Sequence, residues 1–257
     1  MSEPVDRASW VRTFHQAARA RAQLVCFPHA GGSASYFFPL SAALSPEFDV
    51  RIIQYPGRQD RRHEPFVETI DAMAEHAYAA LTAVIDRPVG LFGHSMGAQV
   101  AFEVARGLEQ RAGIQPATVF VSASRAPSRS RGGLGQLGDD AAVVEQMRNL
   151  GGTDQRIFDD EELLQVALAA FRNDFEATER YRRSTDVQIG APLVVMTAVD
   201  DPRTTFDEAI AWQAHTSAGT ALHTFDGGHF FLERHAGEVT ALIAETLRGR
   251  VPDPGVD

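Results

Sequence analysis

A serine framed by glycines is the residue in this sequence best suited to do chemistry. Residues 91–98 read Leu-Phe-Gly-His-Ser-Met-Gly-Ala, with Ser95 at the centre of a Gly-x-Ser-x-Gly motif. A short apolar run precedes it at residues 88–92, and apolar residues at helical spacing follow from 98 to 108. A strand, a sharp turn and a helix in this order predict that Ser95 projects its hydroxyl as a nucleophile.

The residues next to Ser95 indicate how that hydroxyl would be used. We expect Ser95 to adopt a strained backbone conformation, in which a side chain at position 93 or 97 would collide with the neighbouring strand or helix. The Met96 N–H would lie at the N-terminus of the following helix. A backbone donor at that point can stabilise a developing oxyanion.

A second oxyanion donor is expected from a loop after an early strand. The apolar run at residues 23–27 is followed by Pro-His-Ala-Gly-Gly-Ser at residues 28–33. We therefore predict that the Ala30 N–H is the second donor. His29, in the same loop, is expected to hold the loop rather than to act as a base.

The predicted base is His229. A serine hydroxyl is a weak nucleophile until an imidazole takes its proton. His229 follows the strand predicted at residues 221–225 and a Gly-Gly pair that lets the loop reach back over the sheet. His94 is expected to serve packing, and the other histidines are expected on predicted surface helices, loops or a strand: His15, His63, His76, His215, His223 and His235.

The carboxylate that orients this base is either Asp200 or Asp201. Both follow the strand predicted at residues 192–197. Asp201 is favoured, because it precedes Pro202 and lies one residue further into the loop. The chain order Ser, Asp, His is that of the α/β-hydrolases.

Composition restricts the class of protein. With 257 residues, 44% of them apolar, the chain can bury a sizeable core as a single α/β domain, residues 1–257. The net charge of −10 disfavours nucleic acid as a partner, and all 24 basic residues are Arg, which excludes a catalytic lysine. The single cysteine, Cys26, excludes an internal disulfide framework and a multi-thiolate metal site.

Neither a signal peptide nor a membrane-spanning run is expected. The first ten residues lack the charged and apolar blocks of a signal peptide, and no apolar run approaches the roughly 18 residues of a membrane span. Together with the composition, this favours a cytoplasmic protein with no membrane partner and no metal. We expect a monomer.

Strands and helices alternate along most of the chain, which predicts a mostly parallel sheet flanked by helices. Strands are expected at 23–27, 48–55, 88–92, 117–122, 192–197 and 221–225, and helices at 70–81, 98–108, 139–150, 159–183, 206–215 and 234–248. Residues 124–190 break the alternation with two helical segments and an apolar stripe of Leu164, Leu168, Phe171 and Phe175. We interpret 124–190 as a helical lid over the active site, with ordinary crossover helices as the alternative.

Taken together, the motifs resemble those of the type II (external, editing) thioesterases that accompany nonribosomal peptide and polyketide synthases. The resemblance extends almost end to end, over residues 27–33, 55–58, 92–98, 172–175 with Tyr181, 200–202 and 225–232. It implies the α/β-hydrolase fold, and Asp201 as the acid. It supports Ala30 and Met96 as oxyanion donors. Ala198 departs from the family pattern, which often has Gly before the acid.

The resemblance also implies the substrate. This is an acyl group held as a thioester on the phosphopantetheine arm of an acyl or peptidyl carrier protein, so the enzyme itself would need no cofactor. Leu164, Leu168 and Phe171 are then candidates for the wall of an acyl pocket as well as for the core. Because carrier proteins are usually acidic, docking needs a basic patch, for which two clusters are hypotheses: Arg58, Arg61 and Arg62, and Arg125, Arg129 and Arg131.

Two other functions fit the same residues. A carboxylesterase or lipase acting on free oxygen esters would use the same triad. A non-catalytic module that binds carrier proteins would keep the fold alone, but the presence of all three triad residues argues against it.

Overall fold

The protein is organised around a seven-stranded sheet. The computed structural model describes residues 7–129 and 137–251. From one edge to the other, the sheet consists of β1 (Val11–Arg12), β3 (Phe48–Ile53), β2 (Ala22–Phe27), β4 (Val89–His94), β5 (Thr118–Ser122), β6 (Leu193–Ala198) and β7 (Thr220–Phe225). The two-residue β1 pairs antiparallel with β3, and all other neighbouring strands are parallel. The predicted mostly parallel α/β architecture is confirmed.

The central strands are buried on both faces of the sheet. Successive side chains of a strand point to opposite faces. In β2, Val25 and Phe27 therefore join one apolar cluster, whereas Leu24 and Cys26 join the other. Burial on both sides explains why these strands read as continuous apolar runs rather than as an alternating pattern.

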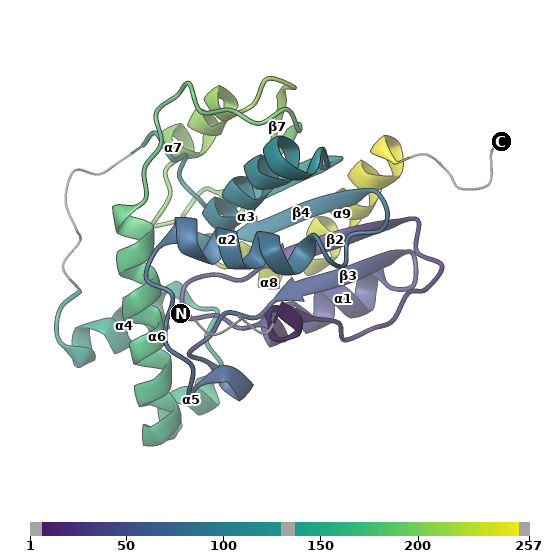
Figure 1. Cartoon of the computed structure of the whole chain (residues 1–257). Coiled ribbons are helices and arrows are strands. Elements are labelled where there is room, and N and C mark those ends of the chain that lie inside the picture. Colours follow the sequence, from purple (N-terminus) through teal and green to yellow (C-terminus); the bar gives the residue numbers. More distant parts are fainter. Residues whose placement is uncertain (1–6, 130–136, 252–257) are drawn as a thin grey trace.

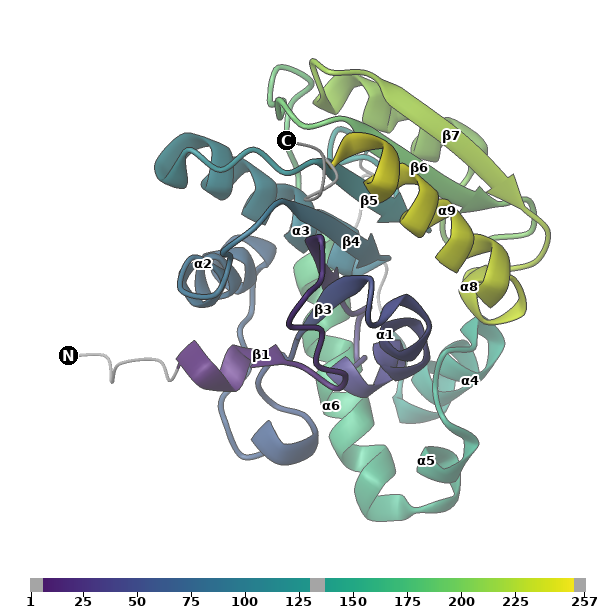
Figure 2. The ribbon, with the colours of Figure 1, turned by 90° about the vertical axis from the view of Figure 1, so that its right-hand side faces the viewer.

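Helices cover both faces. Helices α2 (Ile70–Leu81) and α3 (Met96–Gly107) pack on the face that carries Val25, and α1 (Phe38–Leu44) and α9 (Ala236–Arg250) pack on the other (Figure 2). Helix α2 begins after Thr69, whose side chain accepts a hydrogen bond from the Ala72 N–H at 3.2 Å. This contact satisfies one of the backbone donors left free at a helix start.

Three helices between β5 and β6 form a separate group at one end of the sheet (Figure 1). They are α4 (Asp140–Leu150), α5 (Gln155–Asp159) and α6 (Glu161–Arg180), and we refer to them together as the cap. The N-cap of α6 is Asp160, which accepts from the Leu163 N–H at 3.0 Å. The cap has its own small apolar cluster, formed by Val143, Met147, Leu168, Phe171 and Phe175.

Two short helices precede and follow the last strand. Helix α7 (Phe206–Ile210) starts with a reciprocal capping box between Thr205 and Glu208, and α8 (Phe231–Arg234) directly precedes α9. Among residues 7–129 and 137–251, no helix combines the length and apolarity that crossing a bilayer would require.

Some local expectations are wrong. The sequence does not predict the short 3-10 turn and edge strand β1 that residues 7–12 form, where Trp10 is buried against Tyr55 and His76. Helices α1 and α5 were not predicted. His215, expected on the surface, is buried and contacts the Val187 carbonyl and the Ser128 hydroxyl. Residues 1–6, 130–136 and 252–257 lie outside the described part.

Candidate active site

Ser95 lies on the turn between β4 and α3. Its backbone angles are φ 55° and ψ −119°, a region that residues with a side chain rarely adopt. The turn is tight because two glycines lack side chains. A Cβ atom at Gly97 would lie 1.9 Å from the Phe27 carbonyl oxygen, and one at Gly93 would lie 2.3 Å from the Gly97 carbonyl oxygen. The backbone thus forces the serine hydroxyl out of the turn.

The structure brings Ser95, His229 and Asp201 together from three separate segments. His229 Nε2 lies 2.9 Å from Ser95 Oγ, and His229 Nδ1 lies 2.9 Å from each carboxylate oxygen of Asp201. Asp201 Oδ1 also accepts from the backbone N–H groups of Arg203 at 2.8 Å and Thr204 at 3.3 Å. These contacts hold the carboxylate in place, and the carboxylate in turn fixes the imidazole.

The two neighbouring aspartates differ in their surroundings. Asp201 is buried against His229, whereas Asp200 is exposed beyond the end of β6. The geometry therefore favours Asp201 over Asp200 as the partner of the imidazole.

The two predicted oxyanion donors belong to segments next to this arrangement. Met96 is the first residue of α3, so its N–H has no acceptor within the helix. Ala30 lines the same cavity as Ser95 and His229. Ala30 belongs to a turn in which the Gly32 N–H donates to the His29 carbonyl at 2.9 Å.

A small cavity lies between Ser95 and the cap. Its volume is about 40 Å³, little more than the roughly 30 Å³ that one water molecule occupies in the liquid. Its walls come from the sheet-borne loops and from the cap: His29, Ala30, Ser95, Met147, Leu150, Gly151, Thr153, Phe171, Phe175, Thr178, Arg203, His229 and Phe230. The catalytic hydroxyl thus faces a narrow, largely apolar space.

Only one of the three predicted acyl-pocket residues reaches this cavity. Phe171 lines it, whereas Leu168 is buried in the cap's apolar cluster and Leu164 packs against that cluster. Met147, Leu150 and Phe230 also line the cavity and were not among the residues predicted from the sequence. For Met147 and Leu150 the available signal was their helical spacing within α4, which places them on neighbouring turns.

Two further histidines surround the catalytic imidazole. Burial, together with the nearby His229 and Arg58, lowers the pKa of His29 to about 3. Burial, with His229 and His29 adding to the effect, also lowers the pKa of His94 well below its usual value. His94 Nδ1 lies 3.0 Å from Ser122 Oγ, and its ring centroid is 5.4 Å from that of His229. Both rings are therefore neutral at neutral pH and serve as packing around His229.

The predicted basic patches are wrong for three of their six arginines. Arg58, Arg61 and Arg125 are buried, in ion pairs with Asp174, Glu64 and Glu179 respectively. Arg62 and Arg129 are exposed, and Arg131 lies outside the described residues. Sequence composition could not separate a buried, paired arginine from a solvated one.

Within the part of the chain that the structure describes, no three His, Cys, Asp or Glu side chains are grouped so that they could hold a metal ion.

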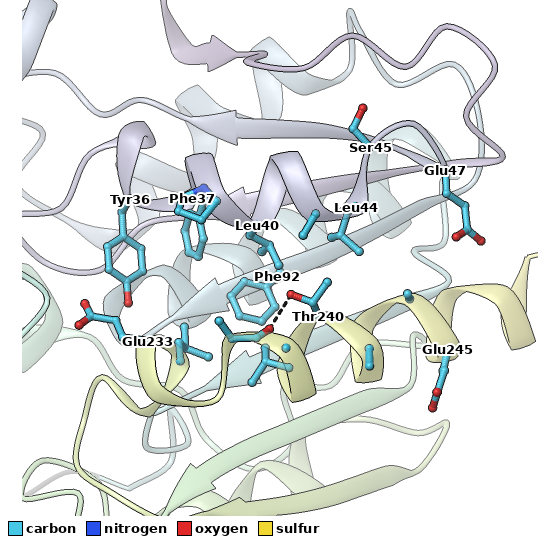
Figure 3. A pocket seen from close by; sticks show the side chains of 18 of the residues that line it. Tyr36, Phe37, Leu40, Leu44, Ser45, Glu47, Phe92, Glu233, Thr240 and Glu245 are labelled. Carbon is cyan, nitrogen blue, oxygen red and sulfur yellow. Dashed lines mark hydrogen bonds between the residues drawn. The ribbon is translucent and has the colours of Figure 1, made fainter.

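A larger hollow lies elsewhere, between α1 and α9 (Figure 3). Its volume is about 920 Å³, and Phe37, Leu40, Leu44 and Phe92 contribute to its apolar walls. None of Ser95, Asp201 and His229 lines it. This hollow is therefore not the site of the chemistry.

Comparison with known proteins identifies relatives of the whole chain. Residues 22–247 match the family described as Thioesterase domain. The chain is 42% identical to "Thioesterase PikA5" of Streptomyces venezuelae over 244 residues, which cover 95% of this chain and 87% of that protein. Some other curated relatives are longer, and the match spans 66% of one and 17% of another.

Solved structures give the same result. The type II thioesterase BorB, from the borrelidin biosynthetic cluster, superposes with a TM-score of 0.86 at 46% identity, covering 93% of this chain and 98% of BorB. YbtT, a type II thioesterase from the yersiniabactin NRPS/PKS biosynthetic pathway, superposes with a TM-score of 0.84 at 30% identity, covering 95% and 100% of the two chains.

Proposed function

The chain belongs to the thioesterase domain family, and on this premise we propose that it hydrolyses acyl groups from phosphopantetheine thioesters on carrier proteins of a polyketide or nonribosomal peptide synthase. Such hydrolysis removes acyl groups that block the carrier, which is an editing function. The observation that carries the proposal is the hydrogen-bonded series Ser95, His229, Asp201 at the floor of a cavity walled by the cap.

The geometry supports a two-step mechanism. His229 Nε2 takes the proton of Ser95 Oγ, and the oxygen attacks the thioester carbonyl carbon. The N–H groups of Ala30 and Met96 stabilise the resulting oxyanion. The C–S bond then breaks, and the imidazolium gives its proton to the leaving thiolate.

The second step repeats the first with water. His229 takes a proton from a water molecule, whose oxygen attacks the acyl-serine ester, and the imidazolium returns a proton to Ser95 Oγ as the free acid leaves. Asp201 stays ionised and stabilises the imidazolium in both steps. These three side chains and two backbone donors account for the reaction without a cofactor of the enzyme's own.

We propose that the cap is the lid of the acyl site. Phe171 and Phe175 of α6 and Met147 and Leu150 of α4 close the cavity over Ser95. At about 40 Å³, the cavity admits only a short acyl group with the cap in this position. Longer acyl chains require Met147 and Leu150 of α4 to move away from Ser95.

The remaining features support a cytoplasmic enzyme whose partner is a carrier protein. The net charge of −10 is unsuited to binding nucleic acid. The single cysteine, Cys26, is buried, and burial raises the pKa of its thiol, so it is a packing residue rather than a reactive group. We propose that the enzyme acts as a monomer, since one chain carries the complete triad.

Hydrolysis of acyl-carrier-protein thioesters by the wild type and by Ser95→Ala tests the proposal. We expect turnover of the acetyl thioester by the wild type and a loss of about 10⁴-fold or more in the variant, as for other serine triads. The measurement is release of the free carrier thiol, with acetyl, butyryl and octanoyl groups compared.

Two controls separate the alternatives. Activity on small oxygen esters without activity on any carrier thioester would indicate a general esterase. Inactivity on both, together with failure of Ser95 to react with a fluorophosphonate probe, would leave only a non-catalytic module that binds carrier proteins.

A further inference from the structure

We propose that Arg58 and Asp174 are positioning residues that set the geometry of the oxyanion-binding turn, so that the turn is correctly formed only when helix α6 is seated. The proposal rests on the oxyanion role given to Ala30 under the proposed function. It adds a device that links the position of the cap to stabilisation of the transition state.

The turn itself has a conformation that needs support. The Gly32 N–H donates to the His29 carbonyl at 2.9 Å, which closes a four-residue turn, and Gly31 has φ +73°. A positive φ at the third position is that of a type II turn. The middle peptide group, between Ala30 and Gly31, can also take the opposite orientation of a type I turn. In that orientation the Ala30 carbonyl and the Gly31 N–H exchange sides of the turn, which places a carbonyl oxygen where the present turn has an N–H, next to the Ala30 N–H assigned to the oxyanion.

Asp174 and Arg58 bind the two outer backbone groups of the Gly31-Gly32 pair. Asp174 Oδ2 accepts from the Gly31 N–H at 2.8 Å, which fixes the middle peptide group. Arg58 Nη1 donates to the Gly32 carbonyl at 3.2 Å. The two side chains also bind each other, with Nη1 2.6 Å from Oδ2 and Nη2 3.2 Å from Oδ1. The result is a closed ring of hydrogen bonds that includes the backbone of the turn.

The ring joins three distant segments. Asp174 lies on α6 and is fully buried, and Arg58 follows the loop after β3, where its Nε donates to the Pro56 carbonyl at 3.1 Å. Buried ion pairs contribute little net stability compared with apolar residues of similar size. Stability alone therefore does not account for the pair, whereas positioning of the turn does.

Helix α6 touches the same turn at a second point. A Cβ atom at Gly31 would lie 3.3 Å from Phe171 Cβ, and Phe171 lines the cavity above Ser95. Displacement of α6 would thus remove the acceptor of the Gly31 N–H and open the acyl cavity at the same time. The oxyanion site is therefore complete only while α6 is seated against the turn.

Two neutral double variants isolate the positioning role. Arg58→Met with Asp174→Leu leaves no buried charge but removes the acceptor of the Gly31 N–H. Arg58→Met with Asp174→Asn is also uncharged but keeps an amide oxygen that can accept from Gly31. Tyr181→Phe is the matched control, because it removes another buried contact of the α6 C-terminus with the core, the 2.5 Å hydrogen bond to Glu103, far from the turn in sequence and not part of the ring.

The readouts are kcat and KM for a small acetyl thioester, the Ki of an alkylboronic acid, and the Tm. The boronic acid bonds to Ser95 Oγ and presents a tetrahedral oxygen to the oxyanion donors. Removing an oxyanion donor costs about 10²- to 10³-fold in kcat, so we expect misplacing one to cost about 10- to 100-fold. The Met/Leu variant should show this loss in kcat with KM little changed, and a matching rise in Ki.

The Met/Asn variant should recover much of that loss, and Tyr181→Phe should retain wild-type kcat even where its Tm is lowered. Wild-type kcat and Ki in a folded Met/Leu variant would overturn the proposal, as would equal losses in both double variants. Should the Met/Leu variant not fold, Arg58→Lys provides the test. Lysine keeps the positive charge, but its ammonium group lacks the planar set of donors with which Arg58 binds both the Asp174 carboxylate and the Gly32 carbonyl. An unchanged kcat in Arg58→Lys would also overturn the proposal.

These measurements separate this inference from the proposed function. Lack of turnover of carrier-bound thioesters by the wild type contradicts the proposed function. The boronic acid comparison depends only on Ser95 and its oxyanion donors, and it tests the positioning role in either case.

Discussion

The catalytic groups and the walls around them come from two differently built regions. Ser95, Asp201 and His229 follow the ends of β4, β6 and β7, strands buried in the sheet or paired along their length. Most of the apolar walls of the cavity come instead from α4 and α6 of the cap, whose own apolar cluster is small. The sheet thus positions the reacting side chains. Entry to the cavity is controlled by the cap helices, which are held by a few polar contacts.

This difference predicts different consequences for substitutions in the two regions. A change at a strand end should reduce kcat for every substrate, because the reacting groups are the same for all of them. A change at an apolar cap residue that lines the cavity should alter which acyl groups are accepted, and leave the chemistry on the smallest acyl group largely intact; Asp174, which holds the oxyanion-binding turn, is the exception.

The largest effect is expected at the catalytic acid. Asp201→Asn should lower kcat by about 10³- to 10⁴-fold, because an amide stabilises the wrong imidazole tautomer. Asp200→Asn is the matched control and should leave kcat within about twofold, since surface substitutions away from functional contacts have small effects. The measurement is turnover of acetyl-carrier protein. Comparable losses in both variants would contradict the assignment of Asp201.

A second effect concerns the pH dependence of the free energy of unfolding, to which two histidines near Ser95 contribute. The folded-state pKa of His29 is lowered to about 3, and that of His94 is also lowered, whereas an unfolded histidine titrates near 6.5. Below about pH 6.5 the unfolded chain binds protons that the folded chain does not. The free energy of unfolding should therefore be highest above that pH and fall as pH decreases, by up to about 1.4 kcal/mol per pH unit for each histidine.

Urea unfolding between pH 5 and 7.5 measures this slope. His29→Gln should reduce it. An unaltered slope in His29→Gln would show that His29 is not the group responsible.

A smaller effect is expected in the cap. Phe171→Ala enlarges the cavity over Ser95 and should raise the ratio of octanoyl to acetyl turnover by about 10-fold, the scale on which apolar pockets discriminate by size. Leu164→Ala changes the same helix without touching the cavity, and should alter the ratio by less than about twofold. Equal changes in both variants would indicate a general loosening of α6 rather than a specific wall.

The sequence predicted the sheet-borne region well, for identifiable reasons. The strands are buried apolar runs, and the Gly-x-Ser-x-Gly motif allows few backbone geometries, since side chains at Gly93 and Gly97 would clash. His229 was singled out by its place after a strand and a Gly-Gly pair. The choice between Asp200 and Asp201 rested on a neighbouring proline and the family pattern.

Contacts between residues far apart in the sequence were not predicted. The pair of Arg58 and Asp174 joins positions 116 residues apart, and a single sequence holds no signal for such a contact. Arg58 was therefore interpreted as part of a surface patch. Leu164 and Phe171 share one stripe in the sequence, but only the packing of α6 against the turn decides which of them lines the cavity.

The backbone angles of Ser95 also bear on how far this protein could be stabilised. Holding a residue with a side chain in such a conformation costs of order 1–3 kcal/mol, and glycine adopts positive φ far more readily. Ser95→Gly should thus yield a more stable and inactive protein. Selection for thermal stability alone would favour loss of the nucleophile. Stabilising substitutions should therefore be made at other positions, with Ser95 retained.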